Sequence, residues 1–422
     1  MGLNRRDFMK TSGLALLAGT ALNGQVLAQG AGGRPLKATF DEVLGKAVQR
    51  GDIPGVVAAI ADRSQVTYLG AFGERALGKG VAMTTDSVFN IASMTKPVTG
   101  TAAMQLVEQG KLELDVPISR WAPEAAKLQV LDGWDANGEP RLRPARREVT
   151  LRHLLTHTSG FAYNQWDAEL DRYMKAKGFP ALNSGQEAAF YPPLMFDPGE
   201  KWEYGISIDW AGKLVEIVSG KSLGAYMQDN IFQPLGMAST GYRLTPDMEA
   251  RRVATHQRGP DGRLTEIAWS GQPQPVPELG GGGLYSTAGD YVRFVQMILN
   301  GGTGNGNRIL KPETVELMAH NAMGATRVGM LRTTNPARSE DAEFFVGLPK
   351  SWGLSFMINE ETAPTGRSAG SLAWAGLYNT FFWIDRSRGF SGIYMTQVLP
   401  FVDGKTLAAF HEFEKAAYQA VS

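Results

Sequence analysis

The sequence predicts an α+β fold in which an antiparallel sheet, built from both chain ends, is flanked by helices and joined to a mainly helical inserted domain. Apolar runs bounded by turn residues occur over residues 56–72 and again over 352–398. The segment between them, about residues 100–250, has apolar residues at helical spacing and long connections rich in Pro and Gly. Strands from both ends therefore complete one sheet, and the intervening helices pack on it.

The N-terminal part of the sheet domain is predicted to contain one helix and two strands. Apolar residues recur on one face of residues 38–50, and Gly51 ends this helix. Residues 56–60 and 66–72 have strand character, and Asp62-Arg63-Ser64 between them is typical of a turn. The two strands are therefore expected to be neighbours in the sheet.

The C-terminal part is predicted to contain three strands and a final helix. The strands cover residues 352–358, 376–384 and 392–398, with a turn at 385–389. A helical stripe of apolar residues then runs from Leu407 to the end of the chain.

These elements give the expected domain boundaries. Residues 29–112 and 250–422 form the sheet domain, and residues 113–249 form the mainly helical domain. Residues 126–148 and 162–193 are predicted to be loops or short helices at the rim of a cleft, where they set selectivity.

The first 28 residues read as a twin-arginine signal peptide. Arg5 and Arg6 precede an apolar run over residues 14–22, and Val26-Leu27-Ala28 matches a cleavage site. The run is far shorter than the ~20 residues that span a bilayer, so no permanent membrane anchor is expected. The sequence thus predicts export by the twin-arginine machinery to a periplasmic or secreted location.

Composition excludes several classes of function. Lys and Arg number 42, as do Asp and Glu, so the chain lacks the basic surplus of a nucleic-acid-binding protein. It contains no Cys, which excludes a disulfide scaffold, a thiolate metal site and a cysteine nucleophile.

Ser93-Met94-Thr95-Lys96 is a candidate nucleophile segment of the form S-x-x-K. Apolar residues recur at helical spacing from Val98 to Gly110, and Pro97 is tolerated only in the first turn of a helix. The helix therefore begins close to Ser93 and places Lys96 one turn away on the same face. A serine hydroxyl needs an adjacent base, and a lysine with a lowered pKa can be that base. The alternative is a capping serine beside a solvated lysine.

Two other patterns carry less weight. Gly220-Lys221-Ser222-Leu223-Gly224 fits the G-x-S-x-G elbow, but a helical stripe precedes it where the elbow needs a strand. Gly220 is instead expected to end one helix and Ser222 to begin the next. His153 and His157 are four residues apart, but no H-E-x-x-H accompanies them, so structural roles are expected and no metal or cofactor is predicted.

Five ordered segments resemble the class C β-lactamase-like serine hydrolases, and their motifs are most similar to those of family VIII carboxylesterases. The resemblance extends from about residue 38 to 415 and implies a β-lactamase/transpeptidase-like fold. The segments are residues 90–97 around the S-x-x-K, 154–160 (L-L-T-H-T-S-G), 197–204 (P-G followed by Tyr204), 281–290 (G-G-G-L-Y-S-T-A-G-D) and Trp374-Ala375-Gly376.

The resemblance implies a mechanism. Ser93 attacks an acyl carbon, Lys96 and Tyr204 exchange the proton, and the backbone N–H groups of Ser93 and Leu377 hold the oxyanion. Which of Lys96 and Tyr204 is the base stays open. The Trp374-Ala375-Gly376 segment is expected to bind substrate.

Departures from the β-lactamase pattern restrict the class of substrate that is expected. Trp374 stands where the β-lactamases carry the Lys of K-T-G, and Gly205-Ile206 follows Tyr204 in place of a segment with Asn. Both changes favour a small, neutral ester with an apolar part over an anionic β-lactam. Ala375 is expected to narrow the site slightly. A β-lactamase or a D-aminopeptidase-like or amide-oligomer hydrolase remains an alternative, and a non-catalytic cell-wall or ligand-binding protein is a remote one.

Overall fold

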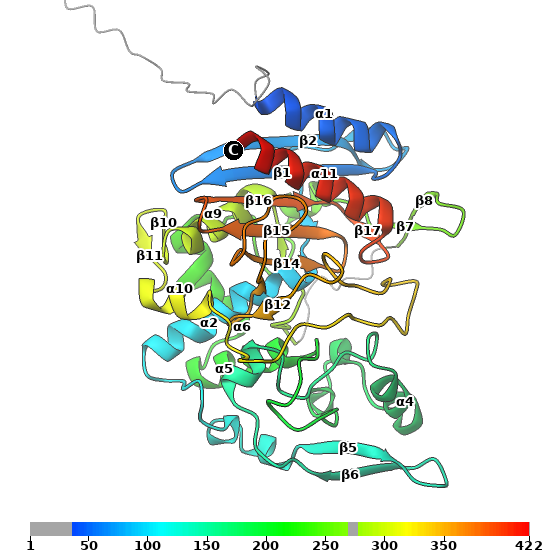
Figure 1. Ribbon diagram of the computed structural model, residues 1–422, viewed down its shortest axis with the longest axis vertical. Coiled ribbons are helices and arrows are strands. Elements are labelled where there is room, and N and C mark those ends of the chain that lie inside the picture. The colour runs from blue at the N-terminus through cyan, green and yellow to red at the C-terminus, as the bar shows by residue number, and fades with distance from the viewer. Residues whose placement is uncertain (1–35, 269–276, 422) are drawn as a thin grey trace, which may run out of the picture.

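A computed structural model describes residues 36–268 and 277–421. Its centre is an eight-stranded sheet with the order β12-β13-β14-β15-β16-β1-β2-β3 (Figure 1). The neighbouring strands are antiparallel. The strands are β1 (Gly55–Asp62), β2 (Val66–Ala76), β3 (Val81–Ala82), β12 (Lys350–Trp352), β13 (Met357–Asn359), β14 (Leu372–Gly376), β15 (Thr380–Asp385) and β16 (Phe390–Met395).

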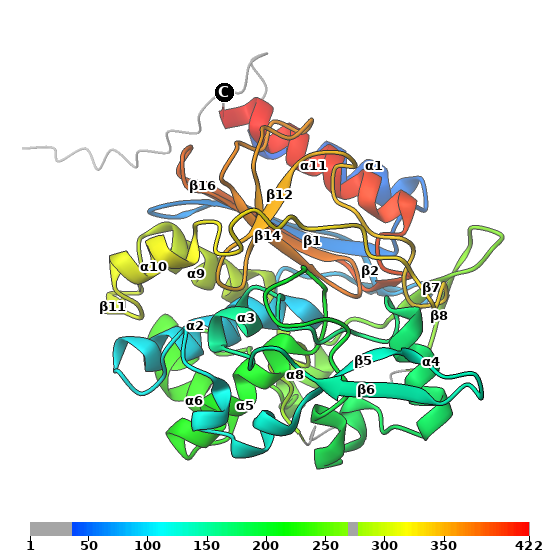
Figure 2. The same ribbon diagram turned by 60° about the horizontal axis from the view of Figure 1, so that its bottom comes forward.

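Helices cover both faces of this sheet (Figure 2). The first and last helices, α1 (Leu36–Gln49) and α11 (Gly404–Val421), pack against each other on one face. On the opposite face, α9 (Ala288–Leu299) lies against β1 and β16. The nucleophile helix α2 (Thr95–Glu108) lies on this second side and packs against α5 (Ser207–Ser219). The candidate site is therefore placed between the sheet and the helical layer.

The remaining elements surround this frame. The helices are α3 (Leu151–Leu155), α4 (Ala168–Lys177), α6 (Leu223–Met227), α7 (Gln233–Leu235), α8 (Pro246–Ala250) and α10 (Pro312–Met318). The short strands are β4 (Phe89–Asn90), β5 (Gln129–Trp134), β6 (Pro140–Pro144), β7 (His256–Arg258), β8 (Leu264–Glu266), β9 (Tyr285–Ser286), β10 (Thr303–Gly304), β11 (Asn307–Arg308) and β17 (Val398–Leu399).

The predicted α+β fold with a sheet built from both chain ends is confirmed. Strand β1, near the N-terminus, pairs with β16, near the C-terminus, with Val57 opposite Met395 and Asp62 opposite Phe390. The predicted hairpin between residues 56 and 72 is also present, and the Asp62 carboxylate closes its turn by accepting from the backbone N–H groups of Ser64 and Gln65. A short polar side chain can replace a backbone partner in such a turn.

Two C-terminal strand predictions were wrong because each apolar run contains a turn. The predicted strand 352–358 is a hairpin of β12 and β13, and Ser355 in the turn has φ +80°. The predicted strand 376–384 begins at the end of β14, turns at Asn379 with φ +60°, and continues as β15. The turn at Ser355 is buried and the turn before Asn379 contains apolar Leu377, so neither has the run of exposed polar residues that marks a turn in a sequence.

Two further expectations concern segments outside the sheet, the predicted rim segment 126–148 and the predicted signal peptide. Residues 126–148 include the β5–β6 hairpin, and none of them lines the candidate active-site cavity, so the prediction that they rim the cleft was wrong. The predicted signal peptide, residues 1–28, lies outside the described residues. Within the part of the chain that the structure describes, no helix combines the length and apolarity needed to cross a bilayer.

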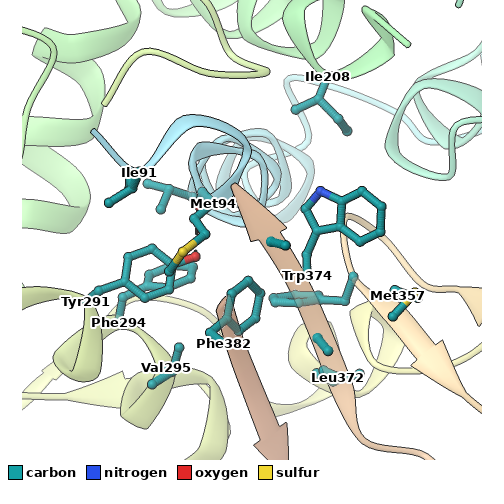
Figure 3. Packing of buried hydrophobic residues seen from close by; sticks show 14 of the residues in the cluster. Ile91, Met94, Ile208, Tyr291, Phe294, Val295, Met357, Leu372, Trp374 and Phe382 are labelled. Atoms are coloured by element: carbon teal, nitrogen blue, oxygen red, sulfur yellow. Dashed lines mark hydrogen bonds between the residues drawn. The ribbon is translucent and has the colours of Figure 1, made fainter. Parts of the chain in front are cut away.

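The segment that carries Ser93 rests on the hydrophobic core. Figure 3 shows Ile91 and Met94 in the same buried apolar cluster as Trp374, Phe382 and Tyr291, which come from β14, β15 and α9. The hydroxyl of Tyr291 donates a hydrogen bond of 2.8 Å to the carbonyl oxygen of Met94. Close-packed buried side chains have low compressibility, so the core holds the residues on both sides of Ser93 in place.

Candidate active site

Ser93 lies at the junction between a short 3-10 turn, Ala92–Met94, and helix α2. The Nζ atom of Lys96, one turn further on, is 3.1 Å from Ser93 Oγ. Ala92 has φ +41°, and its backbone N–H donates to the side-chain oxygen of Asn90 at 3.0 Å. A non-glycine residue in this conformation costs of the order of 1–3 kcal/mol and occurs mostly where a functional group must be aimed. The predicted pairing of Ser93 with Lys96 is present.

The amino group of Lys96 is fully buried, and its environment favours the neutral form. Burial lowers the pKa of Lys96 to about 7, while the charge of Asp209 opposes this fall. Lys96 Nζ donates to the carbonyl oxygen of Gly281 at 2.6 Å and to the hydroxyl oxygen of Tyr163 at 3.3 Å. A neutral amine has two N–H donors and one lone pair, so these two acceptors leave the lone pair for the hydroxyl hydrogen of Ser93.

Tyr163 and Asp209 form a second layer behind Lys96. The hydroxyl of Tyr163 donates to Asp209 Oδ2 at 3.0 Å, and the backbone N–H of Gly281 donates to Oδ1 at 2.8 Å. A Cβ atom on Gly281 would overlap Asp209 and lie 2.7 Å from the Tyr163 hydroxyl. Burial raises the pKa of Tyr163 well above its usual value, so its hydroxyl remains a donor. Asp209 therefore accepts two hydrogen bonds and faces the Lys96 amine from the far side of this network.

Tyr204, the residue predicted to exchange a proton with Lys96, lies beside Lys96. Its ring centre is 4.6 Å from Lys96 Nζ, and its hydroxyl oxygen accepts a hydrogen bond of 3.0 Å from Trp374 Nε1. Burial raises the pKa of Tyr204, while hydrogen bonds with Ser93 and Trp374 oppose this rise. The structure thus brings Ser93, Lys96 and Tyr204 together, and it adds the indole N–H of Trp374 to the group.

The backbone around Tyr204 is held by the segment that contains the L-L-T-H-T-S-G motif. The backbone N–H of Glu203 donates to the carbonyl oxygen of His157 at 2.9 Å. The backbone N–H of Tyr163 donates to the carbonyl oxygen of Tyr204 at 3.3 Å. The His157 ring is 4.8 Å from the Tyr204 ring. A Cβ atom on Gly205 would overlap the backbone of Phe161 and Ala162. Close approach of two backbones therefore requires glycine directly after Tyr204.

Strand β14 supplies the wall opposite α2. Trp374 and Leu377 line the cavity at Ser93, whereas Ala375 and Gly376 are absent from its lining. Successive side chains of a strand point to opposite faces, so Ala375 faces away from Trp374 into the core. The expectation that Ala375 narrows the site was therefore wrong. A Cβ atom on Gly376 would overlap the carbonyl oxygen of Ile91 and the Thr380 side chain, so this glycine lets β14 approach the nucleophile segment.

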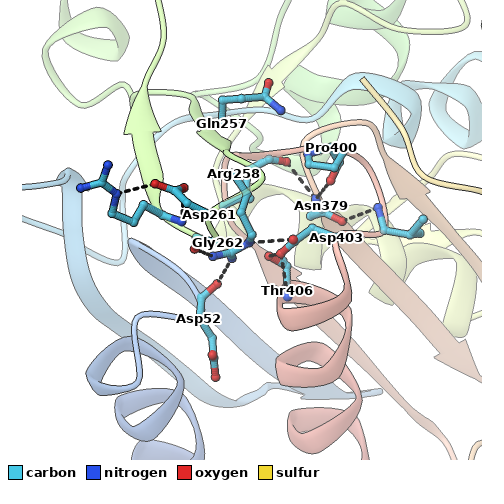
Figure 4. Close-up of polar contacts among 12 residues, drawn as sticks. Asp52, Gln257, Arg258, Asp261, Gly262, Asn379, Pro400, Asp403 and Thr406 are labelled. Carbon is cyan, nitrogen blue, oxygen red and sulfur yellow. Dashed lines mark hydrogen bonds and ion pairs between the residues drawn. The ribbon is translucent and has the colours of Figure 1, made fainter. Parts of the chain in front are cut away.

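The turn after β14, which contains Leu377, is fixed by Asn379. Its side-chain amide donates to the carbonyl oxygens of Val398 and Pro400 at 2.8 Å each, and its side-chain oxygen accepts from the N–H of Val402 at 2.9 Å (Figure 4). This network joins the turn to residues 398–402. The backbone N–H groups of Ser93 and Leu377, the predicted oxyanion donors, are therefore carried by two anchored segments at the same cavity.

The cavity at Ser93 has a volume of about 400 Å³. A second cavity of about 410 Å³ adjoins it and shares Tyr163, Gln165, Asn183, Leu279, Gly282 and Arg338. The second cavity has an apolar wall made of Leu170, Met174, Phe179, Leu182 and Ile206. Cavities of this size hold small organic ligands. The predicted rim segment 162–193 contributes to both cavities, and this part of the rim prediction is confirmed.

Sequence reasoning missed three residues of this site: Tyr163, Asp209 and Arg338. For Asp209 the sequence contains one clue. It lies in the first turn of an apolar helix, and an acidic residue that is buried in such a helix is expected to have a partner. Tyr163 follows the L-L-T-H-T-S-G motif by three residues, but spacing alone does not bring it to Lys96. Arg338 belongs to a long connection whose path only the tertiary structure defines.

His153 and His157 have structural positions just before and in the L-L-T-H-T-S-G motif. His153 N–H donates to the side chain of Thr150, while the backbone N–H of Thr150 donates to His153 Nδ1 at 3.2 Å, which caps helix α3. His157 is buried against Tyr204 and Trp352. Over residues 36–268 and 277–421, no group of three potential ligands among His, Asp and Glu is placed to hold a metal ion.

Comparison with known proteins identifies both a family and individual relatives. The sequence matches the family described as Beta-lactamase over residues 40–416. Monacolin J acid methylbutanoyltransferase from Aspergillus terreus is 33% identical over 392 residues, covering 88% of this chain and 93% of that protein. Lovastatin esterase from Penicillium rubens is 32% identical over 386 residues, covering 87% and 95%.

A solved structure extends this likeness to the fold. Unliganded simvastatin synthase from Aspergillus terreus is 31% identical, with a TM-score of 0.78 and coverage of 91% of this chain and 98% of that one. The fold is the β-lactamase/transpeptidase-like α+β fold that the sequence motifs implied. Similar proteins thus include an acyltransferase and an esterase.

Proposed function

Because the chain belongs to the Beta-lactamase family, we propose that it cleaves carboxylic esters through an acyl intermediate on Ser93. The observation that carries this proposal is the buried amine of Lys96, whose pKa lies near 7 and whose Nζ is 3.1 Å from Ser93 Oγ. A neutral amine at that distance is a base able to activate a serine hydroxyl near neutral pH. The motifs favour kinship with family VIII carboxylesterases within this family.

In the proposed acylation, Ser93 Oγ attacks the ester carbonyl carbon as its proton moves to Lys96 Nζ. The carbonyl oxygen becomes an oxyanion, which the N–H groups of Ser93 and Leu377 stabilise by hydrogen bonds. When the C–O bond to the alcohol breaks, Tyr204 gives its hydroxyl proton to the leaving oxygen. The resulting phenolate recovers a proton from the Lys96 ammonium, so both groups return to their starting forms.

Deacylation follows the same route with water as the nucleophile. Water attacks the acyl carbon, the Ser93–acyl bond breaks, and Ser93 Oγ regains a proton as the carboxylic acid leaves. The indole N–H of Trp374 supports Tyr204 in both steps, because a donor at 3.0 Å stabilises negative charge on the phenolic oxygen. The rest of the indole is available to an apolar part of the ester.

The first experiment is turnover of p-nitrophenyl butyrate by the full chain beside its Ser93→Ala variant. We expect release of p-nitrophenol by the parent protein and its loss in the variant, with an acyl adduct on Ser93 detected by intact mass. Nitrocefin is tested in parallel. Preferred turnover of nitrocefin would favour the β-lactamase alternative, and turnover of neither substrate, without an acyl adduct, would contradict acyl-serine chemistry.

A second candidate function is transfer of the acyl group to an alcohol. The likeness to an acyltransferase, at 33% identity over most of both chains, favours it. The same acyl-Ser93 intermediate would serve, since an alcohol replaces water in the second step. Butyl butyrate formed from p-nitrophenyl butyrate and 1-butanol, measured against free butyric acid, separates transfer from hydrolysis.

We also propose that the protein acts in the periplasm or outside the cell. The twin arginines and the cleavage site in residues 1–28 support this location. Fractionation of cells that carry the parent chain or an Arg5→Lys, Arg6→Lys double variant tests it.

A further inference from the structure

Arg338 lies where three cavities meet. It lines the cavity at Ser93, the adjoining cavity that has one apolar wall and also borders Asp209, and a third cavity of about 200 Å³ that also borders Asn90 and Tyr378. It is exposed to solvent. An arginine in this position is within reach of a ligand that extends out of the Ser93 cavity in any of three directions.

The backbone on both sides of Arg338 is anchored to the site. The N–H of Thr334 donates to the carbonyl oxygen of Gln165 at 2.9 Å, and Trp166 Nε1 donates to the Ser339 hydroxyl at 3.1 Å. The carbonyl oxygen of Arg338 accepts from the N–H of Phe401 at 2.9 Å. Gln165, Trp166 and Phe401 all line the Ser93 cavity. The arginine is therefore held at the cavity by its main chain.

Its charge is not balanced by an ion pair. In the described residues, no carboxylate forms an ion pair with Arg338, whereas Arg332 on the same connection is 2.7 Å from Asp341. Among the described residues that line the Ser93 cavity, Arg338 is the only one of the Asp, Glu, Lys and Arg types. The cavity at the nucleophile thus has a net positive wall, although position 374 carries no cation.

We propose that the ester bears a carboxylate that Arg338 binds, with its apolar body in the adjoining cavity, in place of the neutral ester that Trp374 and Gly205-Ile206 predict. This inference rests on the proposed function and specifies its substrate class. A guanidinium group has parallel N–H donors that match the two oxygens of a carboxylate. A single sign of charge in a concave site also raises the local concentration of oppositely charged ligands. The apolar wall of the second cavity adds the hydrophobic contact that a compact anion lacks.

The carboxylate can belong to the acyl part or to the alcohol part of the ester, and two matched substrate pairs distinguish them. The acyl pair is mono-4-nitrophenyl glutarate and its methyl ester. The alcohol pair is 3-(butyryloxy)benzoate and its methyl ester. In each pair, charge is removed while the scissile bond is kept. The quantity compared is the ratio of kcat/KM for the anionic ester to that for its neutral partner.

We expect Arg338→Ala to lower this ratio by about tenfold or more in one pair, as loss of a charge-assisted hydrogen bond does. Arg338→Glu should lower it further, and about 0.5 M NaCl should reduce the preference of the parent protein because the arginine is exposed. Arg327→Ala is the matched control: it removes an exposed arginine that lines none of the three cavities and bonds to backbone carbonyls.

A ratio unchanged within about twofold in both pairs for Arg338→Ala and Arg338→Glu, with circular dichroism showing native folding, would overturn the inference and leave the proposed function intact. Equal losses on anionic and neutral esters would also overturn it. Failure of the parent protein to cleave any of the four esters would instead contradict the proposed function, and the inference with it.

Discussion

The indole nitrogen of Trp374 donates a hydrogen bond of 3.0 Å to the hydroxyl oxygen of Tyr204. The sequence predicts an apolar replacement for a cation at position 374, which describes only half of the tryptophan side chain. Tryptophan presents an apolar ring and one N–H donor. The apolar ring faces the cavity and neighbouring aromatic rings, and the donor is aimed at a proposed catalytic oxygen.

Replacing that donor predicts a moderate loss of activity. In Trp374→Phe, the Tyr204 oxygen loses its partner, and a hydrogen bond worth about 0.5–1.5 kcal/mol corresponds to about a 2- to 12-fold fall in kcat. Esterase kinetics measure the effect. Trp202→Phe is the control, because the Trp202 indole also stacks near Tyr204 but its N–H has no partner within the described residues. Equal losses in both variants would assign the effect to ring packing.

The pKa of Lys96 predicts an acid limb in the pH profile of kcat/KM. Burial lowers this pKa to about 7, so the amine is mostly protonated below pH 7 and mostly neutral above it. If the neutral amine is the base, kcat/KM rises tenfold per pH unit on the acid side and levels off above about pH 8. Measurement between about pH 5 and 9 tests this, and a profile that is flat across neutrality would remove Lys96 from the role of base.

Removing the charge of Asp209 is expected to move the acid limb of the kcat/KM profile to lower pH. Its negative charge raises the pKa of Lys96 against the effect of burial. In Asp209→Asn the charge is lost, the pKa of Lys96 falls, and the acid limb shifts to lower pH. Glu216→Gln, on the same helix but outside the Lys96 network, is the control and should leave the limb in place. An unchanged acid limb in Asp209→Asn would mean that the carboxyl group is already protonated, because no charge is then lost.

Lys96 and Tyr204 are predicted to act as a unit. Lys96→Ala and Tyr204→Phe should each lower kcat by ~10³ or more, and the double variant should lose little beyond either single variant. The reason is that each group receives the proton that the other supplies. Single-turnover kinetics with an activated ester measure the three values. Near-normal turnover in one variant would exclude that residue from the proton pathway.

Substitution of Gly376 by alanine is expected to lower both thermal stability and activity. In Gly376→Ala the new Cβ atom overlaps the carbonyl oxygen of Ile91 and the Thr380 side chain, so β14 must move away from the nucleophile segment. Overpacking of this kind costs about 1–3 kcal/mol or more, and it displaces the N–H of Leu377. Thermal unfolding and kcat report the two effects. Gly404→Ala, which meets no atom within 4 Å, is the control and should change neither.

The sequence alone determined much of this protein because its strongest signals are local. The period of apolar residues placed α1, β1, β2, α2 and α11, and Pro97 restricted the start of the nucleophile helix to the neighbourhood of Ser93. Ser93 and Lys96 are three residues apart, so helical geometry alone brings them to one face. Tyr204 and Leu377 came from resemblance between motifs, and the structure places both residues at the same cavity as Ser93.

Only the tertiary structure decided which distant groups meet. The turns at Ser355 and Asn379 divide apolar runs that read as single strands. The side-chain amide of Asn379 is satisfied inside the protein by the distant carbonyl oxygens of Val398 and Pro400. Tyr163, Asp209 and Arg338 reach the site through chain packing that no local spacing encodes. A residue's pKa, partner and access to a cavity depend on what surrounds it in space, so the chemistry of Lys96 and the charge of the cavity wall were defined by the fold.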